Sequence, residues 1–303
     1  MSYITVCTPT YNRGNLLYRP YQSLCNQTFK DFIWLIIDDG STDDTKQIVE
    51  DFIGEGKLNI KYIYKKNGGR ASALNESYKH IDTKYVINLD SDDAYLPDAL
   101  MHVHDAWESI PESDRERFWC VTGHSIDSST GKQIGKNWPE GINNLCGEKQ
   151  HKVILKYKGG EKSCCRRIDV LKKYPFPVLP GTNFVPEDLV WEDINRTYDQ
   201  FCVNDIFRIY YTDSCDSLSK GKGIELNKKI GYYYLSLFYL NKCYYQFFYN
   251  KWAKLAPLNV ARLAIILGKK YSDTMKDISN GFKRLLVSLS WPIMMAFVKI
   301  YYK

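Results

Sequence analysis

The 303-residue sequence lacks the residue patterns of a structural zinc site. None of its nine cysteines belongs to a Cys-x-x-Cys pair, and its five histidines do not cluster with them. It also lacks a Gly-x-Ser-x-Gly turn, and His102, His104 and His124 have no partner pattern, so we identify no covalent nucleophile. The odd number of cysteines fits free thiols in a reducing cytosol.

Targeting and spanning segments are also missing. Residues 1–6 show no basic region followed by a long apolar stretch, so we identify no signal peptide and expect the protein to stay in the cytoplasm. The most apolar stretch, Leu285–Val298, is shorter than the ~20 residues that cross a bilayer and contains Pro292. No internal repeat or low-complexity segment stands out.

The first 125 residues alternate between strand-like and helix-like segments. Short apolar runs predict strands, and the segments between them predict helices. Alternation of this kind indicates an α/β fold with a mostly parallel sheet covered by helices on both faces. The predicted strands are 3–8, 32–38, 60–64, 85–89 and 118–122, and the predicted helices are 15–27, 43–53 (capped by Ser41 or Thr42), 70–81 and 97–109.

Three carboxylates follow the fourth predicted strand, at Asp90, Asp92 and Asp93. A buried strand that ends in like charges is costly unless a positive charge lies nearby. A divalent cation that bridges a diphosphate explains this pattern, and oxygen ligands favour Mg²⁺ or Mn²⁺. The alternative is a solvated turn that caps a helix beginning near Pro97.

Polar motifs follow the first two strands as well. Thr8-Pro9-Thr10-Tyr11-Asn12-Arg13 follows one strand, and Asp38-Asp39-Gly40-Ser41 follows the next. Ligands of parallel α/β sheets bind beyond the carboxyl ends of the strands, so the three motifs predict one site. For Asp38 and Asp39 the alternative is compensation of a helix dipole.

Taken together, these three motifs resemble those of family 2 glycosyltransferases. The resemblance covers about residues 1–215 and is strong over the first 110. It implies the Rossmann-like GT-A fold and transfer of a sugar from a nucleotide diphosphate, usually UDP. We expect a GT-A domain at 1–224, divided into a nucleotide-binding half (1–125) and an acceptor-side half (126–224), the latter rich in loops and antiparallel strands over 124–185.

The resemblance also implies roles for individual residues. Asp39 matches the aspartate that accepts a hydrogen bond from the uracil imide, a donor that cytosine lacks. Arg70 is expected to neutralise phosphate, although Lys65 and Lys66 are equally near in sequence. The other residues expected to contact the nucleotide sugar are Thr8, Pro9, Thr10, Tyr11, Arg13, Asn67, Gly69, Asp90 and Ser91. For the glycine pair at 68–69, the alternative is an ordinary turn.

In the family's metal motif, Asp92 matches the residue that ligates Mn²⁺ or Mg²⁺. Asp90 matches the residue that contacts ribose or a metal-bound water, and Asp93 could assist as a ligand. The cation stabilises the leaving nucleoside diphosphate.

Inverting transfer needs a base that deprotonates the acceptor hydroxyl. In the family this base lies about a hundred residues beyond the metal motif, at the start of a helix. Glu187 is nearest to that position and Asp188 is second, although Pro186 replaces the usual first acid. Glu192 and Asp193 lie deeper in the same predicted helix, and we expect them on its solvent face.

The C-terminal region 225–303 is basic and aromatic. It holds 13 Lys and Arg against 3 Asp and Glu, a balance of +10; since the whole chain carries +6, residues 1–224 carry −4. Basic residues beside Trp, Tyr and Phe are typical of helices at a membrane interface. Alternatives are an oligomerising or core-capping helical bundle and, less favoured, a nucleic-acid surface, for which no reader module is present.

We therefore predict an inverting, metal-dependent glycosyltransferase that moves a sugar from a UDP-sugar to a glycan hydroxyl. The expected acceptor is lipid-linked, in surface polysaccharide synthesis, and the expected location is the inner face of the cell membrane. One alternative is a non-catalytic sugar-nucleotide-binding subunit. A sugar nucleotidyltransferase is the other, but it would need a glycine-rich loop that is absent after the first strand.

Overall fold

The computed structural model describes residues 2–212 and 222–301. The chain divides into two compact units, Met1–Phe176 with Val190–Cys215, and Pro177–Leu189 with Asp216–Lys303. The second unit therefore contains the segment 177–189 in addition to the C-terminal helices. Each unit is described by itself below.

The first unit is built on one sheet. In the described residues its strand order is β3-β2-β1-β4-β7-β6-β8-β5. The strands are β1 (Ile4–Thr10), β2 (Phe32–Asp38), β3 (Ile60–Tyr64), β4 (Tyr85–Asn88), β5 (Ala94–Tyr95), β6 (Phe118–Asp127), β7 (Lys162–Arg167) and β8 (Asp199–Tyr210).

The four N-terminal strands are parallel, and their order reverses between β1 and β4. A reversal of this kind opens a crevice at the carboxyl ends of the strands. β1 is buried along its whole length, so the polar residues that follow it leave the core at this edge of the sheet. All five predicted strands are confirmed with small differences at their ends.

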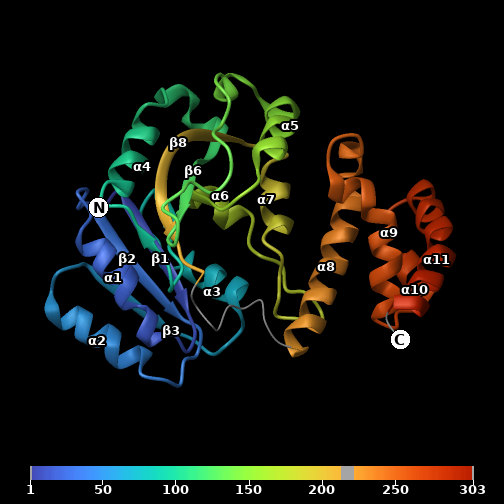
Figure 1. The fold of residues 1–303 in the computed structure, drawn as a ribbon, viewed down its shortest axis with the longest axis horizontal. Helices are drawn as coiled ribbons and strands as arrows, with labels where there is room; N and C mark the ends of the chain where they lie inside the picture. The colour runs from blue at the N-terminus through green and yellow to red at the C-terminus, as the bar shows by residue number, and fades with distance from the viewer. Residues whose placement is uncertain (1, 213–221, 302–303) are drawn as a thin grey trace. The chain divides into compact units, whose positions relative to one another are not determined.

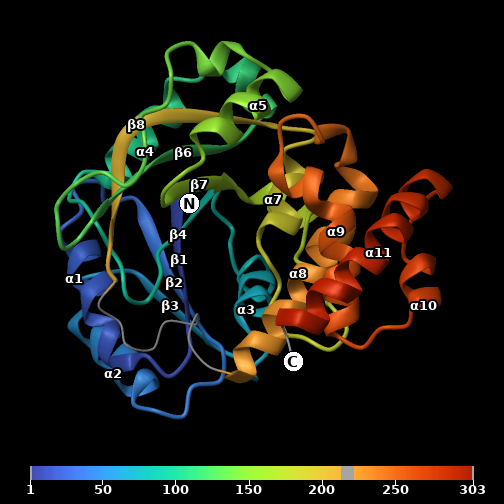
Figure 2. The ribbon, with the colours of Figure 1, turned by 45° about the vertical axis from the view of Figure 1, so that its right-hand side comes forward.

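Helices cover both faces of the parallel strands. α1 and α2 lie on one side of β1–β3 and α3 lies on the other (Figures 1 and 2). The four predicted helices are confirmed, the first as a short 3₁₀ turn followed by α1. The helices to the end of α7 are α1 (Tyr18–Cys25), α2 (Thr45–Glu55), α3 (Arg70–Ser77), α4 (Ala99–Glu108), α5 (Gly147–Tyr157), α6 (Ile168–Lys173) and α7 (Asp188–Ile194).

Two details of the prediction were wrong. The cap of α2 is not Ser41 or Thr42: the helix begins after Asp44, and Asp43 Oδ1 accepts a hydrogen bond from the Thr45 amide at 3.1 Å. The predicted loops of 124–185 contain the antiparallel strand β7, as expected, but also α5 and α6. The glycines there mark turns between short elements instead of one long irregular region.

Aromatic side chains fill the core of this unit. Tyr21 and Phe52 stack with ring centroids 4.0 Å apart, and Tyr85 stacks on Trp107 at 4.3 Å. Each large side chain buried in this way contributes about 1.5–3 kcal/mol. The loops at the carboxyl edge are therefore carried by a tightly packed scaffold.

The second unit contains the expected helical C-terminal region. Its helices are α8 (Lys222–Lys242), α9 (Lys251–Ile266), α10 (Tyr271–Lys276) and α11 (Gly281–Tyr301). α9 lies between α8 and α11 (Figures 1 and 2). Its core includes Tyr233, Tyr239 and Val260.

α11 is longer than the apolar stretch that the sequence suggested, because Pro292 lies within the helix without ending it. By length and composition alone it meets the requirement for a membrane span, and it is the one described helix that does. The expectation that this segment is too short to cross a bilayer was therefore wrong.

Candidate active site

The loops after β1 and β2 are bonded to each other. Asn12, with a φ of 50°, accepts a hydrogen bond from the Thr42 amide on its Oδ1 at 2.7 Å and donates its own amide to Ser41 Oγ at 2.8 Å. The Gly14 amide donates to Asp43 Oδ2 at 3.1 Å. These bonds hold the two predicted motifs side by side at the sheet edge.

Asp39 organises the turn before α3. Its buried carboxylate accepts bonds from Lys65 Nζ at 2.5 Å, the Gly68 amide at 3.0 Å and the Gly69 amide at 2.7 Å. Gly40 permits this approach, because its φ is +89° and a Cβ there would lie 2.8 Å from the Asn67 amide nitrogen. The structure thus brings the predicted residues Asp39, Asn67 and Gly69 together.

Asp38 has a structural role. Its Oδ1 accepts the Ser41 amide at 2.7 Å, and its Oδ2 accepts the Tyr62 hydroxyl at 2.5 Å. Both oxygens are therefore used in holding the β2 loop against β3. These two hydrogen bonds do not indicate that Asp38 compensates a helix dipole, which was the alternative for this residue.

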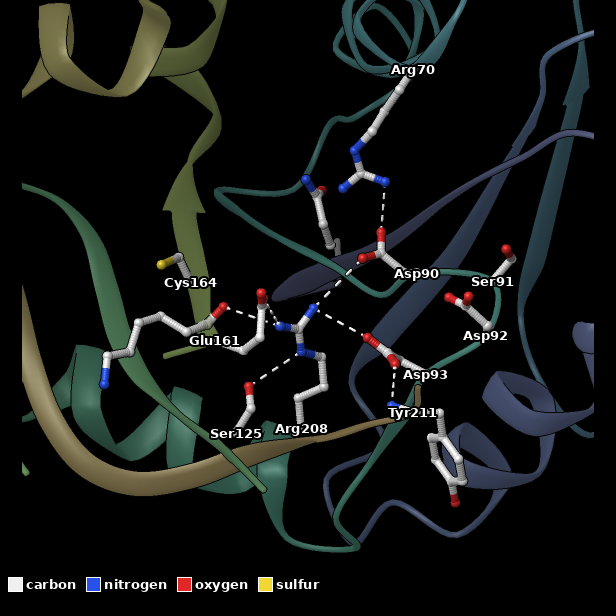
Figure 3. A network of polar contacts seen from close by, with 12 residues as sticks. Arg70, Asp90, Ser91, Asp92, Asp93, Ser125, Glu161, Cys164, Arg208 and Tyr211 are labelled. Carbon is white, nitrogen blue, oxygen red and sulfur yellow. Dashed lines mark hydrogen bonds and ion pairs between the residues drawn. The ribbon is translucent and has the colours of Figure 1, made fainter. Parts of the chain in front are cut away.

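Two arginines, Arg13 in the loop after β1 and Arg70 at the start of α3, meet the acidic segment after β4. Arg70 donates to Asp90 Oδ1 at 2.6 Å, and Arg13 donates to Asp92 Oδ2 at 3.1 Å (Figure 3 shows the first pair). Arg13 also reaches Ser91 Oγ at 3.5 Å. Of the basic residues considered near the glycine turn, Arg70 is the one that reaches this segment, whereas Lys65 is bonded to Asp39.

Arg208, near the end of β8, was missed by the sequence analysis. Its Nη1 lies 3.2 Å from Asp93 Oδ2 and 3.6 Å from Asp90 Oδ2, and its Nη2 donates to Glu161 at 2.9 Å (Figure 3). Its Nε donates to Ser125 Oγ at 3.2 Å. The sequence contained one sign of this role, a single basic residue inside the strand-like run Phe207-Arg208-Ile209. We did not predict a strand there.

The residues that follow β8 complete the network. The Tyr211 amide donates to Asp93 Oδ1 at 2.9 Å, and the Arg19 guanidinium lies 3.7 Å from the centre of the Tyr211 ring. Arg19 also donates to the Asp92 carbonyl oxygen. The acidic loop is therefore held by α1 and β8 as well as by the loops beside it.

These contacts set the protonation of the carboxyl groups. Burial alone would raise the pKa of Asp90, but the charges of Arg70 and Arg208 outweigh it and lower that pKa below the ordinary value. For Asp93, burial dominates and raises the pKa to about 7, although Arg208 opposes the shift. The sequence argument that the carboxylates need a cation to offset their repulsion is thus incomplete, because arginines already supply positive charge.

The donor chemistry of the loop fits a hard divalent cation. Asp90 and Asp92 offer carboxylate oxygens, and Mg²⁺ is usually held by one or two protein carboxylates together with substrate phosphates and water. Within residues 2–212 and 222–301, no group of three His, Cys, Asp or Glu side chains is arranged to hold a metal without such help. For Asp93 to become a ligand, its contacts with Arg208 and Tyr211 would have to break.

The first motif divides into buried and exposed residues. Thr8 is buried and its Oγ1 accepts a bond from Trp34 Nε1 at 2.9 Å, which is a structural contact. Pro9 is buried beside it. Thr10 Oγ1 is buried without a hydrogen-bond partner in the described part of the chain, and the Tyr11 side chain is 46% exposed. Of the residues from Thr8 to Tyr11, Tyr11 is therefore the one whose side chain is exposed to a ligand.

The candidate bases stand at the start of α7. Asp188 is its first residue and Glu187 precedes it; both belong to the second unit and are half-buried. The expectation for Glu192 was wrong. It is buried, its Oε2 lies 3.0 Å from His151 Nε2, and its Oε1 lies 3.4 Å from Lys158 Nζ.

Comparison with known proteins identifies the N-terminal part of the chain. Residues 5–139 match the family model described as glycosyl transferase family 2. An uncharacterized glycosyltransferase of Rickettsia conorii is 43% identical over 97 residues, which cover 32% of this chain and 16% of that protein. A chondroitin synthase of Escherichia coli is 36% identical over 140 residues, covering 45% of this chain and 19% of that protein. The chain thus spans less than a fifth of either relative.

Two solved structures share the fold. Staphylococcus aureus TarS 1–349 in complex with UDP-GlcNAc superposes with a TM-score of 0.62 at 16% identity, over 99% of this chain and 93% of that one. The mannosyltransferase PcManGT of Pyrobaculum calidifontis, in complex with GDP-Man and Mn²⁺, gives 0.52 at 14% identity, over 100% and 88%. These similarities confirm the predicted GT-A fold.

Proposed function

Because residues 5–139 form a glycosyltransferase family 2 domain, we propose that the protein transfers a sugar from a nucleotide diphosphate to a glycan hydroxyl with inversion at the anomeric carbon. The observation that carries this proposal is the convergence of three loops. Arg13, Arg70 and the acidic segment after β4 meet at the carboxyl edge, where ligands of such sheets bind. UDP is the proposed nucleotide.

The loops after β1 and β2 would hold the nucleoside. The exposed Tyr11 ring offers a stacking surface for a base. The Thr10 hydroxyl is also proposed to bond the nucleotide, and since it is buried, the loop would have to open for this contact. Asp39 is proposed to accept the uracil imide. Since Lys65, Gly68 and Gly69 already donate to this carboxylate, that role requires at least one of these bonds to be shared or replaced.

Asp90 and Asp92 are proposed to hold Mn²⁺ or Mg²⁺, a cation that neutralises the diphosphate and stabilises it as a leaving group. Arg13 and Arg70 would then lie beside the phosphates, since each guanidinium already reaches this loop. Guanidinium groups bind phosphate through paired hydrogen bonds, which orients the donor as well as neutralising it. Asp93 and Arg208 are proposed to keep the loop in place.

Glu187 is proposed as the base that takes the proton from the acceptor hydroxyl, with Asp188 as the second candidate. Both carboxylates stand at the first turn of α7. Glu192, in the same helix, is committed to His151 and Lys158 and is not a candidate.

We propose a lipid-linked glycan as acceptor, at the inner face of the cell membrane. The likeness to a chondroitin synthase supports a polysaccharide product. The basic, aromatic composition of residues 225–303 supports an anionic membrane surface as partner.

The test is release of nucleotide from a panel of UDP-, dTDP- and GDP-sugars, detected by mass. We expect release from a UDP-sugar in the presence of Mn²⁺. Asp92→Asn is expected to lower kcat/KM by about a hundredfold or more, because transition-state charge is no longer neutralised. Glu187→Gln is expected to lower it by about 10²–10⁴, the usual contribution of a general base.

Two matched variants control for the substitution itself. Asp82→Asn changes an exposed carboxylate in the loop before β4, at the opposite end of the strand. Asp193→Asn changes a half-buried carboxylate of α7 that is paired with Arg196 at 2.7 Å. Both should retain full activity. Tight UDP binding without turnover of any donor would instead indicate the non-catalytic binding subunit.

A further inference from the structure

α11 exposes a continuous apolar stripe. Phe282, Leu285, Leu289, Ile293 and Ile300 are each between 54% and 70% exposed. Their spacing of three, four and seven residues places them on one face of the helix, because a helix repeats every 3.6 residues. Soluble monomers rarely expose an apolar row of this length without a partner.

The opposite face of α11 holds the helix in its unit. Val287, Trp291 and Met294 pack into the core that α8 and α9 form. The stripe is therefore the exposed face of a helix whose opposite face is packed in the core of the unit.

The charges around the stripe are almost all positive. The charged residues of α11 are Lys283, Arg284 and Lys299, at its two ends, and the exposed Lys270 immediately precedes α10. The few acidic groups of residues 225–303 are engaged locally: Glu225 with Lys229 at 2.7 Å, Asp273 with Lys276 at 2.8 Å, and Asp277 with the Tyr233 hydroxyl at 3.1 Å. Lys283 Nζ and Arg284 Nε also donate to the Asn241 and Ile278 carbonyl oxygens, at 2.8 and 3.1 Å. The positive charge therefore lies at the ends of the apolar row, where it matches anionic headgroups above acyl chains.

We propose that α11 lies in the plane of an anionic bilayer surface, with its exposed stripe in contact with the acyl chains. The proposal rests on the membrane location proposed above and not on the transfer reaction. A failure of vesicle binding would leave nucleotide release in solution unaffected, so the two proposals are tested separately.

The contact with α10 favours this orientation over a helix that crosses the bilayer. The Tyr271 hydroxyl lies 2.6 Å from Ser288 Oγ, and the Tyr271 ring meets Trp291 edge-on at 5.1 Å, near the middle of α11. α10 also carries Asp273 and Lys276. A crossing α11 would bring these charges towards the hydrocarbon centre, where they are costly, whereas an in-plane helix leaves them near the headgroups.

The same charges disfavour a second copy of the chain as the partner. In a two-fold contact along the stripe, the surfaces that meet are identical, so the basic ends face other basic groups. Like charges brought together across an interface oppose association. An anionic bilayer offers the opposite sign.

The experiment is sedimentation of the full chain with vesicles of phosphatidylcholine alone or with added phosphatidylglycerol. Leu289→Glu/Ile293→Glu places two carboxylates in the stripe at exposed positions, so the fold should be retained. We expect the partition coefficient on anionic vesicles to fall about tenfold or more in this variant. High salt should weaken binding of the unaltered chain, and phosphatidylcholine vesicles should bind it less.

The matched control is Val178→Glu/Phe248→Glu. These side chains belong to the same unit, are 95% and 93% exposed, and lie outside α11, so the change in charge is identical. Near-native binding by this control is expected, and circular dichroism should show both variants folded. Equal binding by the two double variants, or no binding of the unaltered chain, would overturn the proposal.

Two further outcomes distinguish the alternatives. Alkaline carbonate should release the chain from membranes of cells that express it, and full retention would contradict the in-plane orientation. Light scattering should give the same mass for the unaltered chain and for Leu289→Glu/Ile293→Glu. A dimer that is lost in this variant while vesicle binding persists would identify a second copy as the partner.

Discussion

At the scale of single residues, the site depends on how a few carboxylates are paired. Asp90, Asp92 and Asp93 each contact a different set of donors, and their surroundings make their roles unequal. Asp93 is buried and bonded on both sides, whereas Asp90 and Asp92 retain exposed surface. This difference is why we assign the two latter residues to the cation and the first to the loop.

Arg208 is the residue whose removal should disturb this arrangement most. Arg208→Gln leaves the buried Asp93 without its ion partner, so we expect the free energy of unfolding to fall by about 1–3 kcal/mol. The loss is limited because Asp93, whose pKa is already raised to about 7, takes up a proton when Arg208 no longer opposes that rise. Chemical denaturation at neutral pH measures this change. Asp93→Asn in the same chain should recover part of the loss, because it removes the buried acid that has lost its partner.

Lys46→Gln provides the control for loss of a cation. Its partner Glu50 lies 3.6 Å away and both side chains are more than half exposed, so we expect a change of about 0–1 kcal/mol. If Arg208→Gln were as mild as Lys46→Gln, the network in Figure 3 would not be what holds the acidic loop.

At the scale of elements, α5 and α7 are joined by a buried contact between an imidazole and a carboxylate. His151 on α5 lies 3.0 Å from Glu192 on α7. Burial alone would raise the pKa of Glu192, but the contact and charge of His151, together with Lys158, lower it below the ordinary value of 4.5. A carboxyl group whose pKa is lowered by folding stabilises the folded state at pH values above its ordinary pKa. This stabilisation is lost as the pH falls through the pKa that the group has in the folded state.

Glu192→Gln should therefore destabilise the protein near neutral pH by about 3 kcal/mol, because it leaves a buried partner uncompensated. Below pH 4.5 the difference from the unaltered chain should shrink. Denaturation curves at several pH values measure both effects. Glu148→Gln, on the exposed face of α5, should show no such pH dependence, and an equal effect in both variants would contradict this account.

Strands and helices differed in how well the sequence predicted them. β1–β4 and the helices between them follow from short apolar runs separated by polar segments. β1, β2 and β4 are almost wholly buried, whereas β3 is only half-buried. α5, β7 and β8 gave weaker signals. β7 reads Lys162-Ser-Cys-Cys-Arg-Arg167, a mostly polar run whose composition does not indicate a strand. Its charged ends contact other polar groups, Lys162 with His124 and Arg167 with Asp169.

The candidate site was predicted only in part for the same reason. Residues directly after β1, β2 and β4 were found, since the carboxyl ends of parallel strands meet at one edge. Arg208 and Glu161 come from elements far along the chain. Arg208 lies on β8, which pairs with β6 in parallel and with β5 in the antiparallel sense, and Glu161 precedes β7, which pairs antiparallel with β4 and β6. Local sequence carries no sign of that long-range contact.

At the scale of the whole molecule, the two units divide the proposed work. The first is proposed to hold the sugar nucleotide at its sheet edge, and the second carries the candidate base and the helix proposed to lie on the membrane. The eight described cysteines are free thiols, so no described disulfide constrains either unit. Cys215 lies outside the described residues.

The central claim is that the acidic loop binds a sugar nucleotide through a divalent cation. Calorimetric titration of UDP into the protein, with and without Mn²⁺, tests it most directly. We expect Mn²⁺ to tighten UDP binding about tenfold or more, a gain of about 1.4 kcal/mol or more. Asp90→Asn/Asp92→Asn should abolish that gain, and a UDP affinity that is indifferent both to Mn²⁺ and to this substitution would contradict the account.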